Sequence, residues 1–231
     1  MKLCVLIALV LVQFITNALG ATMPPNAVKY TPLLISEKTK YWKEMKLVSI
    51  MGAQIEQETC ISLKSPTCWS NDAQLKTSRE QGVGFSQLTR AYTANGAVRF
   101  DSLGALVNKY PKDLAGFSWS NWKDPQLGMR AYVLMIRDTC KAIKGAKDQL
   151  NQISFCLSAY NGGQGGLSND ILSCKAVKGC DPTVWLGNVA LHSLKSKTAI
   201  KGYGQAAYDI NRGYVTNVTV VRRVRYMSLD I

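Results

Sequence analysis

The chain has few of the residues that bind metals. Its 231 residues include a single histidine, His192, and no two cysteines are spaced as Cys-x-x-Cys. Zinc sites are built mainly from grouped histidines and cysteines, so these shortages argue against a metal centre. We therefore expect no metal and no cofactor, and we interpret His192, which is close in sequence to Trp185, as a structural residue.

Acidic residues are also scarce. Fifteen aspartates and glutamates stand against 28 lysines and arginines, which leaves a formal net charge of +13. Such a balance favours polyanionic partners, namely nucleic acid, anionic lipid or an acidic bacterial envelope. No zinc finger, RNA-recognition signature or basic helix is present, so no nucleic acid is expected as a partner. An anionic cell surface is therefore the expected partner. The alternative is that the positive charge forms a solvated basic surface with no specific role.

Long apolar runs are missing after the first residues. Leu3 to Val12 is unbroken apolar sequence behind Lys2, and the small residues Ala18 and Gly20 form a cleavage site before Ala21. This pattern predicts a secretory signal peptide over residues 1–20. The alternative is an uncleaved signal anchor that tethers the protein before releasing it. We expect an exported protein, periplasmic or secreted, with only transient membrane contact through this segment.

One domain is expected to follow the signal. Residues 21–35 contain the pair Pro24-Pro25 near their start and are predicted to form an extended N-terminal arm. The remaining length, residues 36–231, is enough for one well-buried domain and tight for two. No internal repeat indicates tandem modules, and we expect a monomer.

Cysteine usage agrees with export. Apart from Cys4 in the apolar run, the number of cysteines is even, which behind a signal peptide indicates disulfides. Fifteen connectivities are possible for six cysteines. Two short loops favour local pairs, and the third pair then joins two predicted helices at positions that are not symmetric about the turn between them. The expected pairs are Cys60–Cys68, Cys140–Cys156 and Cys174–Cys180.

Hydrophobic periodicity and capping residues predict a mainly α fold. No succession of alternating short strands is apparent, and residues 59–81 are interpreted as a loop. Residues 214–226, rich in valine, are compatible with a strand or with a final helix. Helices are expected over residues 36–58 with Ser36 as cap, 102–109, 124–143 with Asp124 as cap and Pro125 at the first position, 149–160 and 182–194.

The first of these helices places an acid in line with its apolar stripe. Leu47, Met51 and Ile55 recur every four residues, and the next step of three reaches Glu58. Burial of a carboxylate raises its pKa, and a carboxylic acid that is still protonated near neutral pH is what glycosidic bond cleavage requires. Glu56 lies about 200° around the helix from Glu58 and is predicted to face water. The alternative is that Glu58 merely ends a surface helix.

Three segments occur in an order found in one family. Gln57-Glu58-Thr59, Gly84-Phe-Ser-Gln87 and Ala159-Tyr-Asn-Gly-Gly163 resemble motifs of the soluble lytic transglycosylase domain related to goose-type lysozyme. Arg212-Gly-Tyr-Val215 is similar to a later Tyr-Val element. The resemblance spans residues 40–226 and implies a lysozyme-like α fold. It also implies cleavage of the β-1,4 bond between N-acetylmuramic acid and N-acetylglucosamine in peptidoglycan.

The resemblance also implies roles for single residues. Glu58 would be the catalytic acid and then the base, with Tyr214 near it. The substrate-binding residues carried over from the motifs are Thr59, Gln87, Tyr160, Asn161 and Tyr214. The chain departs from the family at Phe85 and Ser86, which replace Leu-Met, at Gly162, which replaces Ala, and at Ile210 and Asn211, where the family has an acid.

Since no acid accompanies the second or third motif, we expect the family's non-hydrolytic route. In it the muramyl C6 hydroxyl attacks the anomeric carbon and gives a 1,6-anhydro sugar. Two alternatives stay open. Hydrolysis, as in goose-type lysozyme, would need a second acid such as Asp72 or Asp101. A non-catalytic relative would grip peptidoglycan with its positive charge and with the tryptophan loop, residues 116–122.

Overall fold

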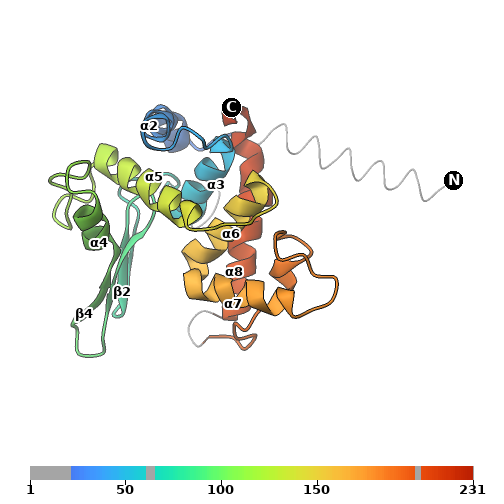
Figure 1. Ribbon diagram of the computed structural model, residues 1–231. Helices are drawn as coiled ribbons and strands as arrows, with labels where there is room; N and C mark the ends of the chain where they lie inside the picture. The colour runs from blue at the N-terminus through green and yellow to red at the C-terminus, as the bar shows by residue number, and fades with distance from the viewer. Residues whose placement is uncertain (1–21, 61–65, 201–203, 231) are drawn as a thin grey trace.

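Helix α3 (Val48–Thr59), which carries Glu58, is almost wholly removed from solvent. The computed structural model describes residues 22–60, 66–200 and 204–230, so the predicted signal segment lies outside the described residues. Ten of the twelve residues of α3 are buried. Figure 1 shows α3 and α5 between a β-sheet on one side and α6, α7 and α8 on the other. The fold is mainly helical, as predicted, and α3 lies at its centre.

The extended arm predicted for residues 21–35 is wrong. Residues 25–41 form helix α2 (Pro25–Tyr41), which has a proline at its first position and packs against α5. Proline there costs nothing, because its missing N–H would have no helical partner. Ala27, Tyr30 and Leu34 are buried at helical spacing and form the apolar stripe that the Pro-Pro pair concealed. The domain therefore begins before residue 36, and Ser36 lies inside α2 rather than capping a helix. The single helix predicted for residues 36–58 is also wrong, because the chain leaves α2 after Tyr41 and starts α3 only at Val48.

A small antiparallel sheet replaces the loop predicted for residues 59–81 and the turn after it. Its strands are paired in the order of the chain. They are short and polar, and β1 is exposed throughout, so they lack the alternation that identifies a strand in sequence. The expectation that short strands are absent is therefore wrong. The strands are β1 (Gln74–Lys76), β2 (Glu80–Val83), β3 (Leu88–Tyr92) and β4 (Val98–Asp101).

Three predicted helices are confirmed, and each begins at an aspartate. The side chains of Asp101, Asp124 and Asp148 accept hydrogen bonds from the backbone N–H groups three residues later. This satisfies donors that the first turn of a helix leaves unpaired. The helices are α4 (Ser102–Lys109), α5 (Pro125–Lys141) and α6 (Gln149–Gly162).

The last third of the chain is helical but irregular. The helix predicted for residues 182–194 is wrong: turns occupy most of this stretch, which includes Gly187 with φ +73°. For residues 214–226 the helical alternative is confirmed and the strand is not: the stretch packs along α3, with Val215 and Val218 buried in the core. The elements are α7 (Gln164–Lys175), the 3-10 helix η1 (Val189–Leu191), α8 (Ala207–Thr216), the π-helix η2 (Asn217–Arg222) and the 3-10 helix η3 (Arg223–Leu229).

All three predicted cysteine pairs are confirmed. Their Cα atoms are 4.3 Å apart for Cys60–Cys68, 5.0 Å for Cys140–Cys156 and 5.5 Å for Cys174–Cys180. The second pair, the least obvious in sequence, joins α5 to α6. Across the described ranges no helix is both long and apolar enough to cross a membrane.

Candidate active site

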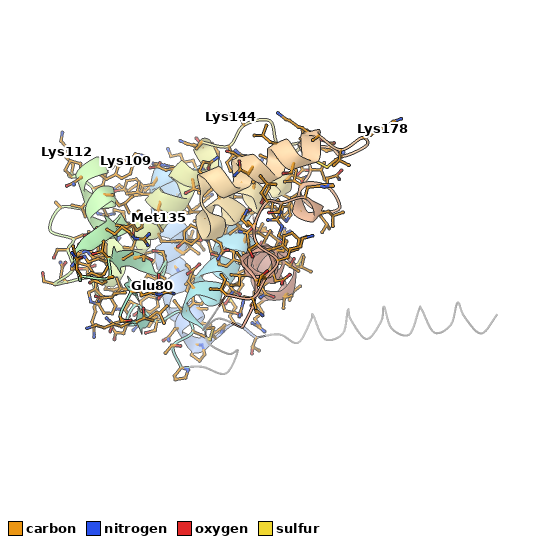
Figure 2. The ribbon with its side chains drawn as sticks, turned by 90° about the horizontal axis from the view of Figure 1, so that it is seen from below. Glu80, Lys109, Lys112, Met135, Lys144 and Lys178 are labelled. Atoms are coloured by element: carbon orange, nitrogen blue, oxygen red, sulfur yellow. A yellow bond between two sulfur atoms is a disulfide. The ribbon has the colours of Figure 1, made fainter. Side chains whose placement is uncertain are left out.

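Glu58 lies where two cavities meet. The larger has a volume of about 740 Å³ and is bordered by α5, the end of α6, and α8. The smaller, about 350 Å³, is bordered by β1, β2 and the loop after α3. Both are lined by Glu58, Gln87 and Thr89, so they form one groove with the acid at the junction. Met135, which lines the larger cavity, and Glu80, which lines the smaller, are labelled in Figure 2.

The surroundings of Glu58 favour its protonated form. The residue keeps partial contact with solvent in the groove, but protein atoms surround the carboxyl group closely. Burial raises the pKa of Glu58 from 4.5 to about 7, against the opposing effect of a hydrogen bond from Tyr214. A carboxyl group with this pKa can give up and recover a proton near neutral pH, as a general acid–base catalyst must. The prediction that Glu58 has a raised pKa thus agrees with its environment.

A chain of buried hydrogen bonds holds the partner of Glu58 in place. The Tyr214 hydroxyl donates to Oε1 of Glu58 and accepts from Nε2 of Gln54 at 3.1 Å. The Tyr132 hydroxyl donates to Oε1 of Gln54 at 3.0 Å and is 3.1 Å from the carbonyl of Met51. Sequence reasoning found Tyr214 but missed Gln54 and Tyr132. One signal in the sequence could have indicated this chain of hydrogen bonds: Gln54 is a polar residue within the apolar part of the α3 sequence.

Tyr160, predicted to bind substrate, lies beside Tyr214. The two rings are stacked with their centroids 6.2 Å apart and an interplanar angle of 13°. The Tyr160 hydroxyl donates to the backbone carbonyl of Ser86, which couples α6 to the second motif. Burial raises the pKa of both phenols well above the ordinary value, and the charge of Glu58 adds to this. Both tyrosines are therefore neutral hydrogen-bond donors in the groove.

Gln87 lines both cavities in an unusual backbone conformation. Its φ is +46°, in the left-handed region that few non-glycine residues adopt. The amide Nε2 donates to the carbonyls of Gly84 at 3.0 Å and Ala73 at 3.3 Å. A Cβ atom at Gly82 would lie 2.8 Å from Oε1 of Gln87, so the glycine makes room for this side chain. Such a strained, tightly held residue is typical of a functional site.

Asn161 is exposed in the larger cavity and is oriented from behind. Its Oδ1 accepts a hydrogen bond of 3.2 Å from Nδ2 of the buried Asn211, which also bonds Ser158. This leaves the Asn161 amide nitrogen to donate to a ligand. Gly162 follows, and a Cβ there would lie 2.7 Å from Nδ2 of Asn211. The glycine in place of the family's alanine is therefore coupled to Asn211, another position at which the chain departs from the family.

The hydroxyl of Thr59 is used within the protein. It donates to the carbonyl of Ile55 at 2.6 Å and accepts from the backbone N–H of Trp69 at 2.7 Å. Thr59 lines the smaller cavity, but it is buried and its hydroxyl already fixes the loop that follows α3. The structure thus gives this residue a positioning role, and substrate binding by Thr59 stays a prediction.

Glu56 does not face water, which corrects the sequence prediction. Its side chain is fully buried and accepts hydrogen bonds from Arg222, Arg225 and the Tyr226 hydroxyl. Arg222 also donates to Gln57 at 2.7 Å. The helical angle placed Glu56 opposite the stripe correctly, but η2 and η3 cover that side of α3 with paired cations. Glu56 therefore anchors the helix that carries Glu58.

The acids considered for a hydrolytic route lie outside the groove. Asp101 caps α4 and pairs with Arg90 at 2.9 Å, and Asp72 is exposed with Lys123 3.8 Å away. Neither lines the cavities that meet at Glu58. Two acids that sequence reasoning did not consider do line them: Asp209 in the larger cavity and Glu80 in the smaller. No motif marks either residue, so only the fold could find them.

The tryptophan loop does not contribute to the groove. Phe117 is buried in a core cluster, and the Trp119 indole donates to Asp101 at 3.0 Å while Arg90 stacks over its ring at 4.2 Å. Gripping of glycan by this loop therefore has no support in the structure. In the part of the chain that is described, no group of three or more His, Cys, Asp or Glu side chains could hold a metal ion.

Comparison with known proteins adds no assignment. The chain matches no protein-family model, and no curated protein matches it significantly.

Proposed function

We propose that this chain is a peptidoglycan lytic transglycosylase with a lysozyme-like fold. The observation that carries the proposal is the position of Glu58, a carboxyl group with a pKa of about 7 at the junction of two cavities. Cleavage inside a glycan needs such an acid at the scissile oxygen, with a sugar on each side of it. Tyr160, Asn161, Gln87 and Tyr214 line the larger cavity, as the family resemblance implies.

In the proposed reaction Glu58 acts twice. Protonated Glu58 gives its proton to the glycosidic oxygen as the bond from that oxygen to the muramyl C1 breaks. The carboxylate then takes the proton of the muramyl C6 hydroxyl as that oxygen bonds to C1. The products are a 1,6-anhydro sugar and a free 4-hydroxyl, and no water is consumed. The Tyr214 hydrogen bond to Oε1 would hold the carboxyl group in one orientation during both transfers.

Hydrolysis is the second candidate, and it is favoured by one observation. Asp209 lines the larger cavity and Glu80 lines the smaller, so each cavity has a second carboxyl group in its wall besides Glu58. In that case Glu58 protonates the leaving oxygen, and water rather than the C6 hydroxyl attacks C1.

Digestion of purified peptidoglycan by the full chain tests the proposal, with muropeptides analysed by mass spectrometry. We expect anhydro products, lighter by one water than the products of a hydrolytic lysozyme. Glu58→Gln should abolish release, whereas Glu80→Gln and Asp209→Asn should retain it. Products of hydrolytic mass that disappear in Glu80→Gln or Asp209→Asn would establish the second candidate. Binding to peptidoglycan with no release would leave only a non-catalytic relative.

We further propose that the enzyme is exported and acts as a monomer on cell-wall glycan in the periplasm or outside the cell. The three disulfide pairs support an oxidising compartment, and the sequence of residues 1–20 supports secretion. The positive net charge of +13 suits an anionic envelope.

A further inference from the structure

Two half-exposed apolar side chains project from the sheet at the groove. Phe100 on β4 is 53 % exposed and lines the larger cavity, and Leu75 on β1 is 52 % exposed and lines the smaller. Scattered apolar residues are common on protein surfaces. These two instead lie in the walls of the two cavities that meet at the candidate catalytic acid, Glu58.

Irregular strand pairing sets the position of Phe100. Ala91 pairs with Phe100 and Tyr92 pairs with Val98, so Arg99 is an extra residue in β4. Such bulges change the direction of neighbouring side chains and occur often beside active sites. Asp101 follows at once, and its side chain is fixed by Arg90 and by the Trp119 indole. The backbone at Phe100 is therefore held firmly while its ring stays half exposed.

The neighbours of Phe100 in the cavity indicate the class of ligand. Thr89, Ser102 and Thr139 have hydroxyl groups, and Met135 adds a flexible apolar surface. An aromatic ring bordered by hydroxyls suits a pyranose, which has an apolar C–H face and a rim of polar groups. The Thr89 and Thr139 hydroxyls donate to the backbone carbonyls of Gln87 and Met135, so their oxygens can still accept hydrogen bonds from sugar hydroxyls, whereas Ser102 Oγ is engaged by the Thr89 backbone.

We propose that Phe100 is a stacking platform for one N-acetylated sugar ring of a β-1,4-linked glycan in the larger cavity. Leu75 makes a weaker apolar contact to the glycan in the smaller cavity. This inference rests on the proposed function and adds to it a residue that determines how tightly the glycan binds. Neither residue belongs to a segment that carried the family resemblance.

Calorimetric titration with a β-1,4-linked tetrasaccharide of N-acetylglucosamine tests the platform. The full chain carrying Glu58→Gln is used so that the sugar is not cleaved. Adding Phe100→Ala should raise the Kd by about 3- to 10-fold, the usual worth of one aromatic stacking contact. Phe100→Trp should bind at least as tightly as the parent. Because the ring is half exposed, neither change should alter the thermal midpoint.

Val98→Ala is the matched control, because Val98 is on the same strand and equally exposed at 53 % but lines neither cavity. Its Kd should equal that of the parent. A Kd unchanged by Phe100→Ala, an equal loss in Val98→Ala, or no binding by the parent would each overturn the platform. Failure of the proposed function is a separate result. If the wild-type chain releases no muropeptide but sugar binding still depends on Phe100, the stacking platform is supported and the enzymatic function is excluded.

Discussion

Replacing Glu58 by glutamine should stabilise the protein at alkaline pH and leave its stability nearly unchanged in acid. The native fold favours the protonated carboxyl group, since burial raises its pKa from 4.5 to about 7. The unfolded chain keeps the ordinary pKa. Between these two values the native state binds more protons than the unfolded state, so the Glu58 contribution to stability falls as pH rises. Glutamine has the same shape and cannot ionise, so the variant escapes this loss.

The size of the effect follows from the two pKa values. Their difference corresponds to about 3 kcal/mol at roughly 1.4 kcal/mol per tenfold change in proton affinity. Because Glu58 keeps partial contact with solvent in the groove, screening reduces this to about 1–3 kcal/mol. For a domain of this size each kcal/mol changes the thermal midpoint by about 2–4 °C. We therefore expect the variant to melt roughly 3–10 °C higher than the wild type at about pH 8.

Thermal unfolding of both proteins, followed by circular dichroism across pH, measures this difference. Other carboxylates affect both proteins equally, so the difference between the two midpoints isolates Glu58. The difference should be small at about pH 4, grow through the interval between the two pKa values, and level off above about pH 8. A constant difference at every pH would mean that glutamine changes packing rather than charge. No gain at alkaline pH would refute the raised pKa, and with it the main support for Glu58 as the acid.

Three further substitutions probe the surroundings of Glu58. Glu56→Gln leaves Arg222 and Arg225 without their buried partner, so the free energy of unfolding should fall by about 3–5 kcal/mol in urea titrations; a change below about 1 kcal/mol would show that water solvates these cations. Tyr214→Phe removes a hydrogen bond that lowers the Glu58 pKa, so the alkaline limb of the pH–rate profile for muropeptide release should move to higher pH; a limb that stays in place would contradict this coupling. Gly162→Ala puts a Cβ too close to Nδ2 of Asn211, so the free energy of unfolding in urea should fall by about 1–3 kcal/mol. An unchanged free energy of unfolding would show that the surrounding side chains adjust freely.

The helices that sequence analysis found are those whose signals are local. Asp124 and Pro125 start α5 as predicted, because a cap and a first-turn proline act within one helical turn. The stripe of Met51 and Ile55 directed attention to Glu58 for a similar reason, since α3 is buried along that side. Local patterns sufficed wherever one element and its caps determine the outcome.

The missed features either lack a recognisable local hydrophobic pattern or depend on residues far apart in the sequence. The strands are too short and polar to be recognised, and they are held by pairing such as Gly82 with Thr89 and by the Gln87 turn. Helical geometry placed Glu56 correctly on the far side of α3, but only the fold shows that Arg222 and Arg225 cover that side. Sequence reasoning assumed that a side opposite the apolar stripe faces water, and here it faces a second, ionic core.

The ionic core behind Glu58 also affects the timing of folding. The partners of Glu56 lie 166 to 170 residues further along the chain, and Ser49 at the other end of α3 bonds Asp230, 181 residues away. At about 5–20 residues per second, a ribosome needs roughly 10–30 s to make the intervening segment. Until then the nascent chain contains Glu56 but not the arginines and the tyrosine that surround it in the fold. The packing around α3 is therefore complete only after synthesis has reached η3, and a chain that ends before η2 would lack Arg222, Arg225 and Tyr226, the partners of Glu56.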